Sequence, residues 1–416
     1  MLKKLLKKDA TTQDGERTSR RRFLTKAAAT TGAAMAAFPM FAAAQDKKGD
    51  AKGDAKSAAP AAPAVVSSAG PTSMRWQSTW PAKDIFHEYA LDYAKKVNDM
   101  TGGDLRIEVL PAGAVVPAFG LLDAVSKGTL DGGHGVLVYH YGKQNALALW
   151  GSSPAFGMDA NMLLAWHRYG GGKELLTKLY NSIGASVVSF PYGPMPTQPL
   201  GWYKKPITKP EDFKGLKFRT VGISIDLFTG MGAAVNALPG GEIVPAMDRG
   251  LLDAAEFNNA TSDRILGFPD VSKVCMLQSY HQNAEQFEIM FNKARFDALP
   301  AKIRAIIELA VEAASADMSW KAIHRYSQDY IELQTKHNVK FYKTPDSVLQ
   351  KQLQIFDQVL EKRKDNALFV EIVESQRKFA ERTVRWDLDT NVPRRMAYNY
   401  YFGKAGAGKG AEKKKA

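Results

Sequence analysis

Three polar side chains stand alone among apolar neighbours, and their types predict the capture of a small charged molecule. Gln198 lies in PMPTQPLGWY (residues 194–203), Arg219 in LKFRTVG and Glu256 at the end of LLDAAEF. A guanidinium fork binds a carboxylate through two parallel hydrogen bonds, a geometry that lysine cannot offer. A glutamate on the same wall would repel that carboxylate unless a cation lay between them. The three residue types are therefore compatible with a carboxylate site only if a cation separates the ligand from Glu256.

Each of these residues also has an ordinary structural explanation, which the pattern alone leaves open. Three prolines hold residues 194–203 in an extended conformation, and in that setting Gln198 also fits a solvated loop. Arg219 follows an alternating strand pattern, and an arginine there commonly faces solvent. Its position among apolar neighbours is what makes a binding role worth considering.

Signatures of the common enzyme classes are missing from the sequence. It has no GxSxG elbow, no P-loop and no GxGxxG in a strand–turn–helix context. The single cysteine, Cys275, excludes an intramolecular disulfide and any four-cysteine metal site, and the seven histidines show no HExxH spacing. We therefore expect a protein that is not an enzyme. An exported enzyme with a metal at Glu256, or a scaffold without a ligand, remains an alternative.

Both ends of the chain have the composition of processing and tether segments. Residues 19–24, SRRRFL, form a twin-arginine core, and an Ala-rich run ends in a small-residue cleavage site at 42–44. Residues 1–44 are thus expected to be a twin-arginine signal peptide that exports the protein to the periplasm. Residues 45–73 and 403–416 are rich in Ala, Gly, Lys and other small or charged residues, which predicts a disordered linker and a disordered basic tail.

The positive charge of the chain belongs mainly to these ends. The formal net charge is +13, of which residues 1–44 carry +6 and residues 403–416 carry +4. The body between linker and tail is left with about +2 by the same count. A fold that binds nucleic acid would carry its own basic patch, so we expect no nucleic-acid partner.

The body has the length and the repeated pattern of two α/β lobes. Its roughly 330 residues exceed a usual single core. A strand pattern at 74–80, a helix pattern at 85–101 and a strand pattern at 105–110 indicate a mostly parallel sheet with covering helices. The pattern Ala-x-x-(Lys/Arg)-Gly-x-Leu-Asp occurs at 124–131 and again at 246–253, each before a short strand. We therefore expect Tyr139 and Glu256, which follow these strands, to face a common cleft.

The second half of the body is mainly helical. Helical spacing predicts helices over 300–318, 319–335, 346–365 and 369–383, with one strand over 338–342. The last helix runs on to the aromatic stretch MAYNYYF, residues 396–402, which we expect to pack on the body or on a second subunit.

Residues 74–402 resemble the periplasmic solute-binding subunits of TRAP transporters, the DctP-like family, and most closely the branch that binds 2-oxoacids and lactate. The resemblance rests on WHRYGGGKELLTKLYNSIG (166–184), Gly193-x4-Gln198-x2-Gly201-Trp202, KPEDFKGLKFRTVG (209–222) and LPGGEIVPAMDRGLLDAAEF (238–257). It implies an α/β, two-lobed periplasmic binding protein of type II-like topology, with a hinge, a ligand cleft and long C-terminal helices. The expected ranges are 74–197 and about 285–323 for lobe I, about 198–284 and 324–366 for lobe II, and 367–402 for a C-terminal dimerisation segment.

The resemblance also implies how the ligand is held. Arg219 would bind the carboxylate of a small organic acid, and Na⁺ or Ca²⁺ would bridge the acid to the protein. The implied ligand contacts are Gln198, Arg219, Tyr139, Trp202 and Phe257, and the implied cation ligands are Glu256, the Phe257 carbonyl, Gln282 and Gln198. The implied partners are a small 2-oxo or 2-hydroxy monocarboxylate such as pyruvate or lactate, the TRAP permease in the membrane, and a second copy of the chain.

Two positions depart from the pattern of that branch. Phe257 stands where the branch usually has Trp, which keeps a backbone carbonyl but makes the pocket wall smaller. Gln282 stands where we align an acidic cation ligand, which keeps an oxygen but removes a charge. A dicarboxylate, a sugar acid or an aromatic acid therefore remains an alternative ligand for the same fold.

Overall fold

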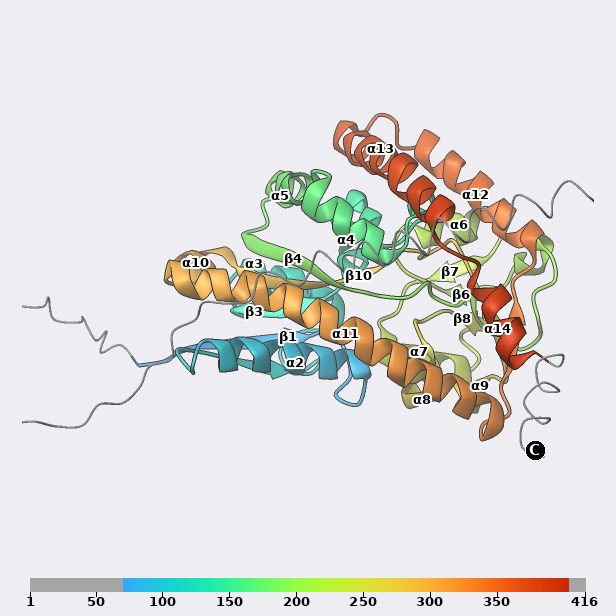
Figure 1. Cartoon of the computed structure of the whole chain (residues 1–416), viewed down its shortest axis with the longest axis horizontal. Coiled ribbons are helices and arrows are strands. Elements are labelled where there is room, and N and C mark those ends of the chain that lie inside the picture. Colours follow the sequence, from blue (N-terminus) through green and yellow to red (C-terminus); the bar gives the residue numbers. More distant parts are fainter. Residues whose placement is uncertain (1–69, 404–416) are drawn as a thin grey trace, which may run out of the picture. The chain divides into compact units, whose positions relative to one another are not determined.

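The computed structural model describes residues 70–403 and contains two β-sheets, each with its own covering helices (Figure 1). This confirms the expected mixed α/β fold with two lobes. Of the segments predicted at the ends, the signal peptide, the linker up to residue 69 and the tail from residue 404 lie outside the described residues. No helix of the described part is long and apolar enough to cross a membrane.

The sheet of lobe I has the strand order β2-β1-β3-β10-β4. The first three strands pair in parallel, whereas β10 pairs antiparallel with both β3 and β4. The late strand β10 therefore returns the chain to the first lobe. The bounds are β1 (Thr72–Ser78), β2 (Leu105–Leu110), β3 (Gly132–Gly135), β4 (Val187–Pro194) and β10 (Gln286–Asn292).

The sheet of lobe II has the order β11-β9-β5-β8-β6-β7. The two copies of the repeated pattern lead into β3 and β8, one in each sheet, as the sequence predicted. The bounds are β5 (Gly201–Tyr203), β6 (Lys217–Arg219), β7 (Ala234–Asn236), β8 (Ala254–Ala255), β9 (Val274–Leu277) and β11 (Lys340–Lys343).

The chain passes between the two sheets in two neighbouring segments. One segment joins β4 to β5 and holds the prolines of 194–203, and the other joins β9 to β10. They run side by side, because the backbone N–H of Met195 donates to the carbonyl of Glu285 at 3.1 Å. These crossings lie at residues 195–200 and 278–285, next to the lobe boundaries expected at 197/198 and 284/285. The paired segments form the connection that we call the hinge.

Helices cover the sheets, and one of them spans both lobes. α11 (Ala301–Thr335) contacts α2 and β4 of lobe I and then α8 of lobe II (Figure 1). The prediction of two helices broken near residue 318 was wrong, since no proline or glycine interrupts residues 301–335. The other helices of the two lobes are α2 (Ile85–Met100), α3 (Leu121–Ser126), α4 (Ala160–Tyr169), α5 (Gly172–Ser182), α6 (Ser224–Gly230), α7 (Gly240–Asp248), α8 (Ala260–Leu266), α9 (Phe268–Val271) and α10 (Lys293–Asp297). Short 3₁₀ turns are η1 (Ala118–Gly120), η2 (Leu137–His140), η3 (Asn145–Trp150), η4 (Ala155–Gly157) and η5 (Pro210–Phe213).

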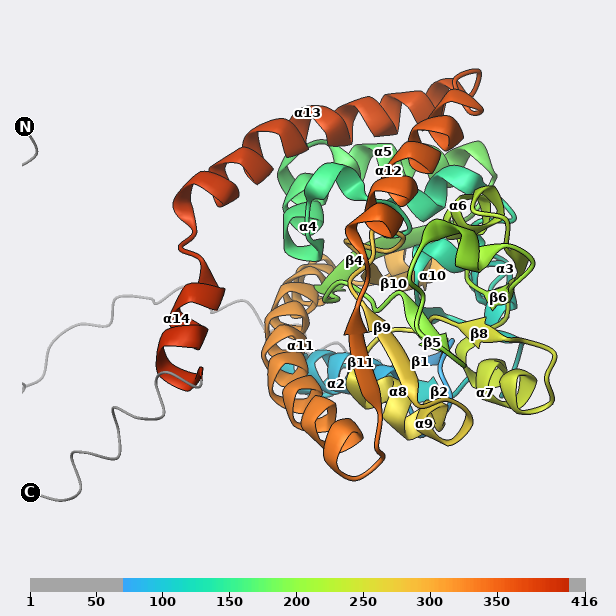
Figure 2. The same cartoon turned by 90° about the vertical axis from the view of Figure 1, so that its right-hand side faces the viewer.

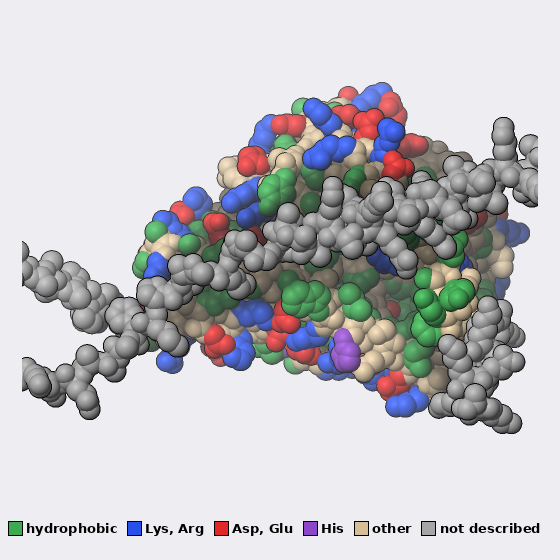
Figure 3. Space-filling view, viewed as in Figure 1, with side chains coloured by type: hydrophobic (Ala, Val, Ile, Leu, Met, Phe, Trp, Pro, Cys, Tyr) green, Lys and Arg blue, Asp and Glu red, His purple; other side chains and the backbone are tan. Residues whose placement is uncertain are grey.

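Three C-terminal helices complete the described chain. α12 (Asp346–Glu361) packs on α6 of lobe II, and α13 (Ala367–Thr390) lies across α4 and α5 of lobe I (Figure 2). α14 (Arg394–Phe402) is a separate helix with no buried residue. The aromatic stretch 396–402 therefore does not pack on the described body, which corrects one of its two expected locations. Hydrophobic side chains gather over α14 on the face drawn in Figure 3.

Candidate functional site

A small cavity lies between the two lobes at the hinge. Its volume is about 20 Å³, the scale of a single water or ion. The lobes are thus closed, and an acid of several atoms fits only if they open slightly. Lobe I lines the cavity with Trp80, Phe86, Val136 and Tyr139, lobe II with Arg219, Val221, Glu256, Phe257 and Asn258, and the hinge with Met195, Gln198, Gln282 and Glu285.

Among residues 70–403, Arg219 is the only arginine or lysine that lines this cavity. It lies at the end of β6 and is 1% exposed. Its Nε donates to the carbonyl of Leu238 at 2.8 Å, and its Nη1 donates to Glu256 Oε1 at 2.8 Å and to the Glu256 carbonyl at 3.2 Å. Nη2 is buried without a partner among the described residues. The guanidinium is thus held on one side and has donor capacity left for a ligand carboxylate.

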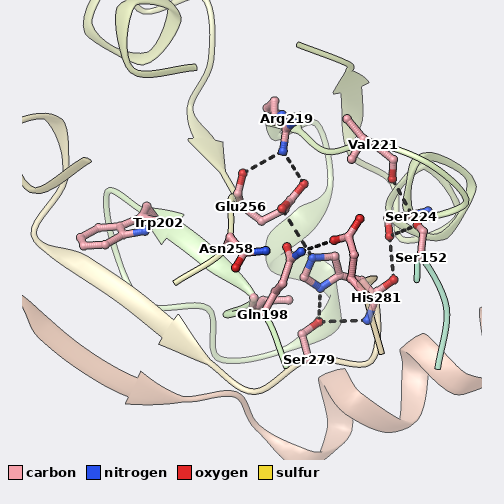
Figure 4. A network of polar contacts seen from close by, with 12 residues as sticks. Ser152, Gln198, Trp202, Arg219, Val221, Ser224, Glu256, Asn258, Ser279 and His281 are labelled. Atoms are coloured by element: carbon pink, nitrogen blue, oxygen red, sulfur yellow. Dashed lines mark hydrogen bonds and ion pairs between the residues drawn. The ribbon is translucent and has the colours of Figure 1, made fainter. Parts of the chain in front are cut away.

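Gln198 is the amide that the hinge presents to this cavity. Its side chain is 2% exposed, and its Nε2 donates to a carboxylate oxygen of Glu285. That bond directs the amide donor to Glu285 and leaves Oε1 without a partner in the described chain. Figure 4 shows Gln198, Arg219 and Glu256 pointing toward one another. The structure thus brings together the three residues from which the sequence analysis started.

Two buried carboxylates, Glu256 and Glu285, share the cavity wall. Glu256 is fully buried and Glu285 is 3% exposed. Burial, and then the negative charge of Glu256, raises the pKa of Glu285 to about 8, while Arg219 and the hydrogen bond from Gln198 act in the opposite direction. A cation between the two carboxylates would relieve this repulsion.

The cavity contains a set of oxygens that suits a hard cation. Gln198 Oε1, Glu256 Oε2, Gln282 Oε1 and Glu285 Oε1 are buried and have no hydrogen-bond partner within residues 70–403. Carboxylate and amide oxygens of this kind fit Na⁺ or Ca²⁺ rather than zinc. In the same range no three His, Cys, Asp or Glu side chains come together as a metal site, so a cation here would depend on the amides as well.

Sequence reasoning missed Glu285. The acidic cation ligand was aligned with Gln282, and its charge was taken as lost. The structure places both side chains in the cavity, so the hinge does supply a second carboxylate. The signal was the acidic residue directly before the strand pattern QFEIMFN, which begins β10 at Gln286. Residues 278–285 form neither a helix nor a strand, so counting back from Asn292 has no regular element to follow there.

Tyr139 and Phe257 lie where the sequence analysis expected them. Tyr139 lies on η2 after β3, and burial raises the pKa of its phenol to about 12, so the hydroxyl stays protonated and can donate to a ligand. The Phe257 ring lines the cavity 5.8 Å from the Arg219 guanidinium carbon and 5.8 Å from the ring of Phe86. These two residues add one polar and one apolar contact.

Trp202 does not line the cavity, although it was expected among the ligand contacts. Its indole N–H donates to Asp263 Oδ2 at 2.7 Å, and its ring packs on Phe268 with centroids 5.7 Å apart. Figure 4 shows the ring directed away from Gln198 and Glu256. Successive strand residues face opposite sides of a sheet, and Trp202 in β5 faces the helices of lobe II.

The closed lobes also meet at a buried carboxylate outside the cavity. Asp84 caps α2 of lobe I, and its Oδ1 accepts from Phe86 N at 3.2 Å and from the hydroxyl of Ser262 in lobe II at 2.6 Å. Oδ2 has no partner in the described part of the chain. Burial raises the pKa of Asp84 to about 6. The charged form is therefore costly at neutral pH.

The body of the chain matches a known family of binding proteins. Residues 77–366 match the model of "bacterial extracellular solute-binding protein, family 7". A monocarboxylate 2-oxoacid-binding periplasmic protein of Nostoc is 31% identical over 325 residues, which cover 77% of this chain and 87% of the relative.

Solved structures of TRAP solute-binding proteins have the same fold. One from Bordetella bronchiseptica, a mixed-occupancy dimer with copurified calcium and picolinate, has a TM-score of 0.76 at 27% identity and covers 82% of this chain and 100% of its own. One from Pseudoalteromonas atlantica with bound sodium and pyruvate has a TM-score of 0.73 at 29% identity and covers 80% of this chain and 99% of its own. Both hold a small acid together with a cation.

The raised pKa of Asp84 predicts a stability change with pH. A carboxyl whose pKa rises on folding, here from 3.8 to about 6, binds more protons in the folded state between these values. The free-energy cost of burying the ionised carboxylate destabilises the fold above pH 6 and is lost as the pH falls toward 4. We expect Asp84→Asn, which can still cap the helix, to flatten this part of a plot of melting temperature against pH.

The exposed Asp104 provides the matched control. Asp104→Asn should give a curve parallel to that of the wild type. If the melting curve of Asp84→Asn against pH were also parallel to that of the wild type between pH 4 and 6, the Asp84 carboxyl would not be the cause of this pH dependence.

Proposed function

We propose that this chain, which belongs to family 7 of the bacterial extracellular solute-binding proteins, binds a short 2-oxo or 2-hydroxy monocarboxylate such as pyruvate or lactate together with Na⁺ or Ca²⁺. It is an extracytoplasmic solute receptor of the TRAP transporter class, and its family consists of receptors rather than enzymes. The observation that carries the ligand proposal is the buried Arg219, whose Nη2 has no hydrogen-bond partner in the described chain, next to two buried carboxylates that each have one oxygen without such a partner.

In this proposal each group of the cavity has a separate task. Arg219 pairs with the ligand carboxylate, and the Tyr139 hydroxyl donates a second hydrogen bond to the acid. A bound cation would supply positive charge between the acid and the protein oxygens, with Gln198, Glu256, Glu285 and Gln282 as the side chains available to hold it. Closure excludes water, which strengthens each of these contacts. Capture thus requires binding and closure but no bond-making step.

The lining argues against two of the alternative ligands. A dicarboxylate would bury a second negative charge, and Arg219 is the single cationic side chain among the lining residues. A sugar acid would bury several hydroxyls opposite apolar walls. An aromatic acid remains a candidate ligand, because it carries a single negative charge. An exported metal-dependent enzyme that uses the same carboxylates remains an alternative function, although the lining residues include no nucleophile paired with a base.

The proposal also covers delivery of the bound acid to a membrane permease and export of the protein itself. The expected partner for delivery is the membrane permease of a TRAP system. The twin-arginine core at 19–24 would send the folded protein to the periplasm. These residues lie outside the described part, so their role rests on the sequence alone.

Replacing Arg219 by Lys tests the ligand site. Lysine keeps the buried charge beside Glu256 but loses the fork, so the affinity for pyruvate should fall about tenfold or more while the protein stays folded. Calorimetry of purified mature protein with pyruvate and lactate measures the affinity, and thermal melting checks the fold. Gln198→Ala should weaken binding in the same direction.

The exposed Arg249 is the matched control, and Arg249→Lys should bind as the wild type does. Wild-type protein that bound no small acid would refute the proposed ligand class. Arg219→Lys with undiminished affinity would refute the site.

The cation is tested at Glu285. Removing one of two facing carboxylates by Glu285→Gln takes away charge that a cation needs, while the amide keeps the shape. We expect added CaCl₂ or NaCl to raise the melting temperature of the wild type above that measured with chelator or in a sodium-free buffer, and to raise that of Glu285→Gln much less. An equal rise in both proteins would exclude Glu285 as a cation ligand.

A homodimer is the oligomeric state that we propose. α14 exposes most of the surface of Tyr398, Tyr400, Tyr401 and Phe402, which is unusual for a monomer in water. A groove of about 510 Å³ between α4, β4 and α11, with the exposed Trp320 at its edge, offers an apolar surface on the same chain. The aromatic side chains of one copy would cover such a surface on the other.

Light scattering tests this state. The wild type should have the mass of two chains, and Tyr400→Ser with Tyr401→Ser should shift it to one chain, because apolar burial between copies is lost. Tyr342→Ser removes a tyrosine from β11 rather than from α14 and should leave the mass unchanged. A wild type with the mass of one chain would contradict the proposal.

A further inference from the structure

The cavity has a polar side and an apolar side, and this division fixes how an acid would lie in it. Its unpaired polar atoms belong to lobe II and the hinge. Lobe I contributes Trp80, Phe86, Val136 and Tyr139, of which only Tyr139 carries a hydroxyl. An acid whose carboxylate pairs with Arg219 therefore directs its tail toward the lobe I wall.

We propose that Trp80, held in place by His134, limits the size of the acid tail and so selects short 2-oxoacids over larger ones. This inference rests on the proposed function and goes on to name the residue that sets specificity. Trp80 would contact the ligand tail directly. His134, which does not line the cavity, acts as a positioning residue.

Trp80 is fixed on several sides. It follows β1 and is 2% exposed. Its indole N–H donates to His134 Nδ1 at 2.8 Å. The rings of Phe86 and Phe287 meet it edge to face, with centroids 4.9 and 5.7 Å away, and that of Tyr139 lies tilted at 5.7 Å. Rotation of the indole would break this bond and these ring contacts at once, so the wall that it forms is stiff.

His134 accepts the hydrogen bond of the Trp80 indole and lies in the central strand of the lobe I sheet. It lies on β3 and is fully buried, and burial lowers its pKa to about 3, so the imidazole is neutral. Because Nδ1 accepts the indole proton, Nε2 carries the remaining ring proton and donates to the hydroxyl of Tyr192 on β4. Tyr192, His134 and Trp80 thus form a connected chain from the sheet to the cavity wall.

The size of the acid differs among the solved relatives, as the pyruvate and picolinate complexes above show. With Trp80 in place, the methyl group of pyruvate would contact the indole face, whereas the ring of picolinate or phenylpyruvate would collide with it. A smaller side chain at this position would leave room for these rings. A tail contact of one or a few carbons changes affinity by about tenfold or more.

The experiment measures the ratio of the dissociation constants for phenylpyruvate and pyruvate by calorimetry. Trp80→Ala should lower this ratio by about tenfold or more relative to the wild type, and Trp80→Phe should lower it by less. His134→Phe removes the acceptor and should shift the ratio toward that of the Trp80 variants. His134→Gln keeps an acceptor and should restore part of the wild-type ratio, a rescue that general destabilisation would not produce.

The pair Trp150 and His167 provides the matched control. The Trp150 indole N–H donates to His167 Nδ1 at 3.2 Å, and Trp150 is fully buried but lies outside the cavity. Trp150→Phe should therefore leave the ratio unchanged.

The outcomes separate the two proposals. If the wild type binds none of the acids, the proposed function fails. If the wild type binds pyruvate and Trp80→Phe, folded by thermal melting, keeps the wild-type ratio, the specificity inference is overturned while the proposed function stands. A ratio that changes equally in Trp150→Phe would also overturn it, because the effect would then be unrelated to the cavity.

Discussion

The buried ion pair between Arg219 and Glu256 is the interaction on which the site depends. Both side chains are at most 1% exposed, and their closest atoms are 2.8 Å apart. Charges withdrawn from water this completely are tolerated only when they are paired and hydrogen-bonded. Here the pairing is incomplete, because Arg219 Nη2 and Glu256 Oε2 have no hydrogen-bond partner in the described residues, and Oε2 lies 3.8 Å from His281 Nε2. A protein rarely leaves such groups unsatisfied, so these atoms are where the fold has capacity for a ligand.

The topology explains how two lobes can close on this pair. β4 and β10 belong to lobe I, and the strands on the other side of each connection, β5 and β9, belong to lobe II. The hinge therefore consists of two adjacent extended segments, and Gln198 and Glu285 sit on different segments and contact each other across it. The prolines at 196 and 199 restrict the first segment. Gln198 and Glu285 are thus held by the connecting segments themselves rather than by the sheet of either lobe.

Much of this arrangement could be predicted from the sequence, because local patterns encode it. The alternation of apolar and polar residues and their helical spacing predicted two α/β lobes. The isolated polar residues Gln198, Arg219 and Glu256 were expected at one site, and all three line the cavity. The errors concern features that depend on packing. Trp202 is next to a glycine of the recognised pattern, but strand alternation turns it to the far side of the sheet. The length of α11 follows from the absence of a breaker rather than from its hydrophobic spacing.

Charge balance gives a reason for the acid and the cation to bind together. Arg219 and Glu256 cancel each other, so the lining starts without net charge before Glu285 is considered. An acid that entered alone would add a buried negative charge beside the negative charge of Glu256. A cation that entered alone would bring positive charge next to Arg219. It would also lack the oxygen ligands that the acid would supply. Together they compensate each other at short range in a medium where Coulomb interactions are strong. The closed cavity therefore favours the pair over either member, which is the physical role of a bridging ion in a receptor for anions.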